Sequence, residues 1–134
     1  MRYIKESKNR RREAELTNMT PSKRFRDAES FLRWVSENFG WNPGEDMWES
    51  DYGIAVTPVS SNVYLNTVDD EGNINPEVFE DMESVLVVGT NRQGEVTGSI
   101  YIDPEDIKTI GISKYMFRFE SKRGTVVDII GTAR

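Results

Sequence analysis

The clearest strand signal in the sequence is VLVVGTNRQGEVTGSIYI, residues 85–102. It begins with four apolar residues in a row, 85–88, and such a run is typical of a strand that is buried on both faces. Residues 91–94 are polar and end in glycine, which predicts a hairpin turn. The chain then returns as a second strand over residues 96–102. This stretch therefore predicts a pair of antiparallel strands.

The pattern extends toward the C-terminus. Residues 103–106 open with Asp-Pro, which is typical of the start of a helical turn. Residues 115–121 alternate between apolar and polar side chains, and a turn at 122–124 leads into a last strand over 126–130. Together with residues 85–102, these segments predict an antiparallel meander or a small curled barrel.

Two more strands are expected nearer the N-terminus, at residues 52–59 and 62–68, which brings the total to about six. Pro58 assigns the first of them to the edge or the end of a sheet, because proline has no N–H to donate. A long helix is predicted over residues 21–39, where apolar side chains recur every three or four positions, and a short helix is predicted after Asn75. The predicted fold class is α+β: an antiparallel meander or small curled barrel of about six strands, with one long N-terminal helix and one short helix.

Charge is divided unevenly along the chain. Residues 1–34 contain ten Lys or Arg and five Asp or Glu, a net charge of +5, whereas residues 35–134 contain seven and eighteen, a net charge of −11; the whole chain carries −6. Residues 1–19 have few side chains to bury and are expected to form a basic, flexible arm. Residues 20–134 are expected to form a single α+β domain. Such a division of charge bears on the choice of partners.

The composition excludes several classes of enzyme, because the chain contains no histidine and no cysteine. Histidine is the usual general base near neutral pH and the commonest transition-metal ligand. Ser-His-Asp and Cys-His chemistry, thiolate metal sites and histidine-held zinc or iron are therefore not available to this chain. No metal and no cofactor is expected, and the protein is expected to be non-enzymatic.

One enzymatic alternative remains, a Mg²⁺-dependent nuclease. Asp103 ends one predicted strand, and Glu120 and Lys122 lie two apart at the end of the next, so that their side chains share a face. Carboxylates that hold a metal ion and a lysine that orients the attacking water are what such a nuclease needs. The competing interpretation is structural: Asp103 caps the helical turn that follows, and Lys122 is a charge in a hairpin.

Two clusters of charge are the candidate contact sites. The basic cluster can neutralise phosphates or contact a protein partner, and it consists of Arg10, Arg11, Arg12, Lys23 and Arg24. The acidic cluster lies in a loop expected over residues 42–51, where an exposed tryptophan among carboxylates would make an interface hot spot. Its members are Glu45, Asp46, Trp48, Glu49 and Asp51.

These features predict a small acidic interaction protein that docks on a larger nucleic-acid-handling assembly and inhibits or modulates it, as a phage-type inhibitor or nucleic-acid mimic does. A structural or assembly subunit with a basic arm is the second alternative, beside the nuclease. A protein partner is expected, with direct contact to nucleic acid through the arm as a further route. No apolar run approaches the roughly 20 residues that span a bilayer, so no membrane contact is expected and the cytoplasm is the expected compartment.

Overall fold

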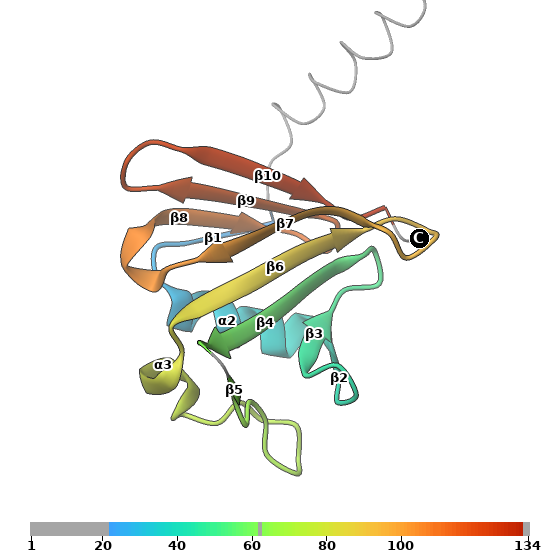
Figure 1. Cartoon of the computed structure of the whole chain (residues 1–134), viewed down its shortest axis with the longest axis vertical. Coiled ribbons are helices and arrows are strands. Elements are labelled where there is room, and N and C mark those ends of the chain that lie inside the picture. Colours follow the sequence, from blue (N-terminus) through green and yellow to red (C-terminus); the bar gives the residue numbers. More distant parts are fainter. Residues whose placement is uncertain (1–21, 62, 133–134) are drawn as a thin grey trace, which may run out of the picture.

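The computed structural model describes residues 22–61 and 63–132, and it shows two antiparallel sheets with few helices (Figure 1). Sheet A has the strand order β1-β8-β9-β10, and sheet B has the order β2-β3-β4-β6-β7, with β5 beside β4. The α+β class and the antiparallel pairing are therefore confirmed. The single curled barrel of about six strands is wrong, because the strands divide between two sheets.

The strands of sheet A come mainly from the C-terminal part of the chain: β1 (Lys23–Phe25), β8 (Ile107–Ile112), β9 (Met116–Ser121) and β10 (Val126–Ile130). Sheet B takes the middle of the chain: β2 (Gly40–Asn42), β3 (Met47–Glu49), β4 (Ile54–Ser60), β5 (Val63–Tyr64), β6 (Ser84–Thr90) and β7 (Val96–Ile102). The helical elements are α2 (Ala28–Asn38), α3 (Val78–Asp81) and the 3₁₀ turn η1 (Pro104–Asp106).

The two C-terminal hairpins form as predicted. In the β6–β7 hairpin the Asn91 side-chain oxygen accepts hydrogen bonds from the backbone N–H of Gln93 at 3.0 Å and of Glu95 at 2.9 Å. Gly94 closes this turn with a φ of 78°, a conformation that glycine adopts without strain. β7 and β10 have the predicted bounds. β8, which sequence reasoning did not anticipate, lies between these hairpins and pairs with β9.

The long helix begins at Ala28 rather than at residue 21. Asp27 caps it, since its carboxylate accepts a hydrogen bond from the Ser30 N–H at 2.8 Å. The three residues of β1 are instead extended and pair with β8, with Phe25 opposite Ile110. The Phe25 ring nevertheless packs on the helix, with its centroid 6.1 Å from that of Trp34. This contact explains why Phe25 continues the spacing of the apolar side chains of the helix.

Other differences lie in short elements. The expected loop over 42–51 is largely a hairpin made by β2 and β3, and the second expected strand shortens to β5. Asn75 does not cap α3; its side-chain amide donates to the carbonyl of Asn66 instead. Pro58 lies inside sheet B, opposite Val85 of β6. On the other side of β4, pairing with β3 stops at Val56 and pairing with β5 begins at Val59, so Pro58 has no strand partner there. The missing N–H is therefore tolerated without a strand edge.

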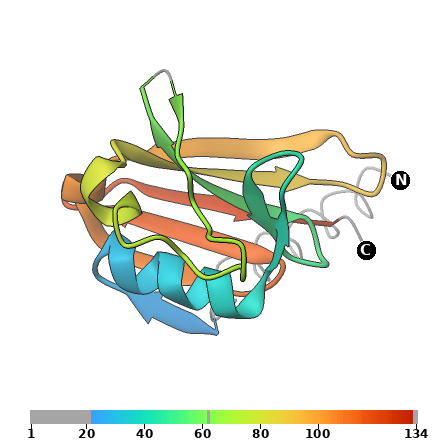
Figure 2. The same cartoon turned by 90° about the horizontal axis from the view of Figure 1, so that it is seen from below.

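The core lies between the two sheets, and α2 packs against it with one face, as Figure 2 shows from a second direction. Phe31 of α2 contacts Phe117 of β9 with ring centroids 5.8 Å apart. The apolar side chains with at most 1% exposure come from α2 and from both sheets: Phe31, Leu32, Val35, Trp48, Ile54, Val56, Val85, Val87, Ile102, Ile110, Ile112, Met116 and Phe117. Within residues 22–61 and 63–132, none of the helices has the length and apolar composition needed to cross a bilayer.

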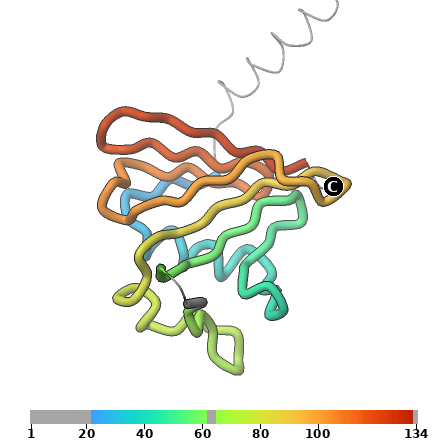
Figure 3. The backbone as a smooth tube through the Cα atoms, in the orientation of Figure 1, coloured from blue at the N-terminus to red at the C-terminus, as the bar shows by residue number. Residues whose placement is uncertain are grey.

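The two sheets approach each other closely where β10 passes β6. A Cβ placed on Gly89 would lie 2.7 Å from both Ile129 Cγ2 and the Ile130 carbonyl oxygen. The Thr97 hydroxyl donates a hydrogen bond to that same Ile130 carbonyl at 2.8 Å. The backbone path of Figure 3 shows β10 running close to β6 and β7 near their hairpin. A side chain at position 89 would therefore collide with β10.

Candidate functional site

The outer face of sheet B is the face turned away from α2. Along β6 the side chains alternate, so that Val85 and Val87 are buried in the core whereas Leu86 and Val88 point outward and are half-buried. The prediction that residues 85–88 are buried on both faces is therefore wrong. Strand register places Leu86 between Thr57 of β4 and Tyr101 of β7.

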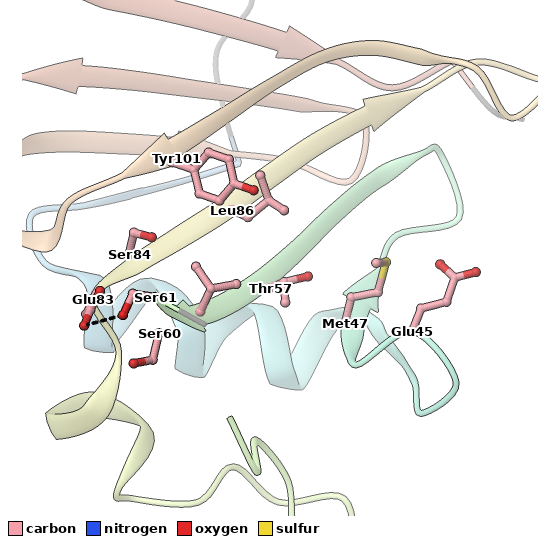
Figure 4. Close-up of a pocket in the computed structure, with 10 residues that line it drawn as sticks. Glu45, Met47, Thr57, Ser60, Ser61, Glu83, Ser84, Leu86 and Tyr101 are labelled. Atoms are coloured by element: carbon pink, nitrogen blue, oxygen red, sulfur yellow. Dashed lines mark hydrogen bonds between the residues drawn. The ribbon is translucent and has the colours of Figure 1, made fainter. Parts of the chain in front are cut away.

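A pocket of about 390 Å³ lies on this outer face (Figure 4). Thr57 and Leu86 lie at its floor, Tyr101 and Met47 lie at opposite sides, and Val59 also lines it. The rim is polar and includes Glu45, Glu83 and three serines of β4, β6 and the turn after β4. Glu83 accepts a hydrogen bond from the Ser61 hydroxyl at 3.2 Å. The pocket is thus apolar at its base and acidic at its border.

A second pocket of about 350 Å³ continues along the same face toward the β6–β7 turn. Glu45 and Met47 line both pockets, so the two adjoin. Ala55, Val88 and Val96 supply apolar lining in the second pocket. We call the two pockets together the outer groove; it follows β4 from its C-terminal end to the connection between β3 and β4.

The border of the outer groove is negatively charged. Glu45 lines both pockets, and Glu49 and Asp51 line the second. All three residues are exposed, and in the described part of the chain none of them pairs with a lysine or arginine. No lysine or arginine among the described residues lines either pocket. The groove therefore combines apolar surface with uncompensated negative charge.

Apolar side chains next to the acidic border are unusually exposed. Tyr101 keeps 67% of its surface accessible and Val96 keeps 63%. Sequence reasoning missed both residues as site candidates. The sequence did contain a signal for Tyr101. A hairpin turn at 91–94 sets Tyr101 opposite Leu86, so that the apolar surface of one strand continues onto the next.

The structure brings three of the five predicted acidic-cluster residues to the groove: Glu45, Glu49 and Asp51. Asp46 lines neither pocket and adopts a φ of 53° in the β2–β3 turn. Trp48 is 1% exposed and packs against Trp41 with ring centroids 5.0 Å apart, so the expected exposed tryptophan is wrong. The reason is strand alternation: when Met47 and Glu49 face outward, Trp48 must face the core.

The predicted basic cluster is only partly within the described residues. Lys23 and Arg24 are exposed on β1, an edge strand of sheet A, and as successive strand residues they point to opposite faces. Arg10, Arg11 and Arg12, like the rest of the expected arm over 1–19, lie outside the described residues.

Each residue of the predicted nuclease site has a structural contact. The Asp103 carboxylate accepts from the Glu105 N–H at 3.0 Å and so caps η1. Glu120 pairs with Lys108 at 3.1 Å. Lys122 is exposed in the β9–β10 turn, where its backbone N–H bonds to Asp106. Among the residues that the structure describes, no three carboxylates cluster in a way that would hold a metal ion. The nuclease remains a prediction without geometric support.

A bidentate ion pair lies on sheet A, away from the groove. Arg118 donates from Nε and from a terminal nitrogen to the two carboxylate oxygens of Asp128, at 2.6 and 2.8 Å. These hydrogen bonds raise the pKa of the Arg118 guanidinium. Because both partners are committed to each other, this pair links β9 to β10.

Comparisons with protein-family models, curated proteins and solved structures found no match, so the candidate site rests on the geometry of this chain alone.

Proposed function

We propose that this chain is a non-enzymatic interaction protein that docks through its outer groove on a basic surface of a larger, nucleic-acid-handling assembly and inhibits or modulates it. The observation that carries the proposal is the acidic border of the groove, in which Glu45, Glu49 and Asp51 lie beside an apolar floor without basic partners.

The two parts of the groove supply different contributions to binding. Apolar side chains such as Tyr101 and Met47 lose contact with water when a partner covers them, and this supplies most of the affinity. Carboxylates at the border steer a basic partner into place and disfavour acidic ones. Proteins that handle nucleic acid present clusters of Lys and Arg for phosphate contacts, so their channels are complementary to this surface.

The proposal is tested with full-length protein as bait in nuclease-treated lysate. One variant reverses the groove charges with Glu45→Lys, Glu49→Lys and Asp51→Lys. The control variant makes the same change of net charge at exposed acidic residues that do not line the groove: Glu37→Lys, Asp70→Lys and Glu71→Lys.

We expect a stoichiometric protein partner to be captured by the wild type and by the control variant and to be lost from the groove variant. Equal capture by both variants contradicts the proposed site. A protein that is captured from untreated lysate but not from nuclease-treated lysate was bridged by nucleic acid. In that case the proposed function is wrong.

A further inference from the structure

We infer that the open edge of β7 receives an extended segment of the basic protein partner, which pairs with Ser99 and Tyr101 as an added strand of sheet B. The inference rests on the proposed function for the existence of that partner, and it adds the way in which the partner binds beside the outer groove. Three features of β7 point to it: the direction of its backbone groups, its composition and the charge at its ends.

β7 is the last strand of sheet B, and within the described residues only β6 pairs with it (Figure 2). β10 approaches β7 at Thr97, whose hydroxyl donates to the Ile130 carbonyl, and at Gly98. The open stretch of the edge therefore begins at Ser99 and runs to Ile102.

Pro58 indicates which backbone groups of β7 face this edge. Proline has no N–H, so it is suited to the non-hydrogen-bonded position of an antiparallel pair. Val85 is opposite Pro58, and its N–H and C=O therefore face β7 rather than β4. Alternation along β6 gives Val87 the same direction. The Thr90 N–H agrees with this alternation, since it bonds to the carbonyl of Gly53, just before β4, at 2.8 Å.

The same alternation directs the backbone of Ser99 and Tyr101 outward. Ile100 is opposite Val87, so its backbone groups pair with β6. Ser99 and Tyr101 lie on either side of Ile100, and the N–H and C=O of both therefore point to the open edge. Within residues 22–61 and 63–132, none of these four groups donates or accepts a hydrogen bond. They are a template on which one more strand can pair.

β7 lacks the features that protect other sheet edges from pairing. Over Val96–Ile102 it contains no charged residue and no proline. Sheet A has charged residues in both edge strands, Lys23 and Arg24 in β1 and Asp128 in β10. Such charges commonly prevent edge pairing in native proteins. An open edge without them is suited to strand addition, in which main-chain hydrogen bonds supply affinity and pockets for alternate side chains supply specificity.

The outer groove provides such a pocket next to the edge. Tyr101 and Leu86 are opposite each other on neighbouring strands and line the first pocket (Figure 4). A segment paired with β7 has every second side chain on this same face, beside the Tyr101 ring. An apolar side chain at that position would cover Tyr101, which is 67% exposed.

Charge at the ends of β7 favours a basic segment over a second copy of this chain. Residues 93–107 contain no lysine or arginine and four acidic residues, all of them exposed: Glu95, Asp103, Glu105 and Asp106. A second copy that paired antiparallel through β7, centred on Ser99, would place Glu95 opposite the second copy's Asp103. Like charges opposite each other are unfavourable, whereas Lys or Arg at the ends of a partner segment would meet carboxylates.

Amide hydrogen exchange of the full-length chain, measured residue by residue by NMR, tests the inference. The probe is the end-blocked peptide Lys-Lys-Thr-Val-Thr-Val-Thr-Lys-Lys, and the control peptide has Glu in place of each Lys. We expect the basic peptide to slow exchange of the Ser99 and Tyr101 amides by tenfold or more. The Asp70 amide, exposed in the loop after β5, should not change. The acidic peptide should have no effect. Exchange at Ser99 and Tyr101 that millimolar basic peptide leaves unchanged contradicts the inference.

A substitution on the edge tests the main-chain pairing itself. Ser99→Pro removes an outward N–H that the fold does not use, and it should weaken binding of the basic peptide by tenfold or more. Ser99→Ala keeps this N–H and is the matched control, with binding expected within twofold of the wild type. Ser99→Lys, which brings positive charge toward the basic peptide, should also weaken binding and does not depend on how well proline is tolerated. Equal binding by the Ala, Pro and Lys variants overturns the inference.

Dilution distinguishes a second copy from a partner. If exchange at Ser99 and Tyr101 is slow without peptide and becomes faster on dilution, a second copy occupies the edge and the inference is wrong.

Partner capture separates this inference from the proposed function. If the partner is lost from the groove variant but retained by Ser99→Pro, the inference fails and the proposed function stands. Protection of the edge by the basic peptide when no protein partner is captured has the opposite meaning: the proposed function fails, while the edge of β7 still receives a basic strand.

Discussion

The inner face of sheet B packs against α2 and sheet A, whereas its outer face is open and carries the outer groove. The same strands make both faces. On the inner face Trp48 and Val87 are at most 1% exposed, while on the outer face Tyr101 keeps 67% of its surface accessible. β6 is apolar toward both sides, yet only one side is covered by the chain itself. An apolar strand with one uncovered face marks a surface that another molecule can bury.

The two faces should differ most in how much a side chain contributes to the free energy of unfolding, and two adjacent residues of β3 test this. Trp48→Ala removes a core side chain and should lower the free energy of unfolding by about 3–5 kcal/mol. Met47→Ala removes a half-buried side chain from the groove and should cost about 1 kcal/mol or less. Denaturant unfolding of the two variants measures this. Equal losses would break the distinction between the faces.

A second test concerns the contact that holds the inner face to β10. Gly89→Ala places a methyl group 2.7 Å from Ile129 and should cost about 1–3 kcal/mol by overpacking. Gly98→Ala is the matched control on the neighbouring strand, because its nearest atom, in Ile129, is 3.6 Å away. The control should change stability by about 0.5 kcal/mol or less. Thermal unfolding that ranks the two variants in the opposite order would refute the close approach of the sheets at Gly89.

On the outer face, stability and binding should separate. Tyr101→Ser should leave the free energy of unfolding within about 0.5 kcal/mol of the wild type, because the side chain is exposed. It should weaken capture of the partner by tenfold or more, which corresponds to about 1.4 kcal/mol. Titration of the captured partner, beside a denaturation curve, checks both values. Binding unchanged by this substitution would remove Tyr101 from the proposed surface.

The smallest effect is expected in the turn that carries the acidic border. Asp46 has a φ of 53°, which glycine adopts more readily than aspartate. Asp46→Gly should therefore be neutral or stabilise the protein by up to about 1 kcal/mol, and it should not affect partner capture. Asp46→Val should destabilise it, because a β-branched residue is strained in this conformation. Both predictions are checked by unfolding experiments, and a stable Val variant would contradict the turn geometry.

Sequence patterns predicted the elements whose signals are local. The β6–β7 and β9–β10 hairpins follow from polar turns that end in Gly94 and Gly124, both of which have positive φ. β1 was missed because Phe25 has the spacing of the helix on which it packs. The hairpin of β2 and β3 was missed because three-residue strands show too little alternation to be recognised.

The candidate site could be predicted only in part, for a different reason. Glu45, Glu49 and Asp51 form a cluster in the sequence, but Leu86 and Tyr101 of the groove come from β6 and β7, much further along the chain. Which of two neighbouring side chains faces outward depends on the register of β3 with β4. This register places Met47 in the groove and Trp48 in the core, whereas Trp48 was expected from the sequence to be exposed. A groove made by distant strands leaves no local pattern for sequence reasoning to detect.

The hydroxyl of Ser50 gives the molecule a natural reporter. It accepts a hydrogen bond from the Ile54 N–H at 3.0 Å and donates to the carbonyl of Lys114 on the other sheet. The rate at which the Ile54 amide hydrogen exchanges with solvent therefore depends on the local stability of the chain at this end of the groove. A molecule that binds against Ser50 and Asp51 should slow this exchange, so the amide at the first residue of β4 would report occupation of the adjoining surface.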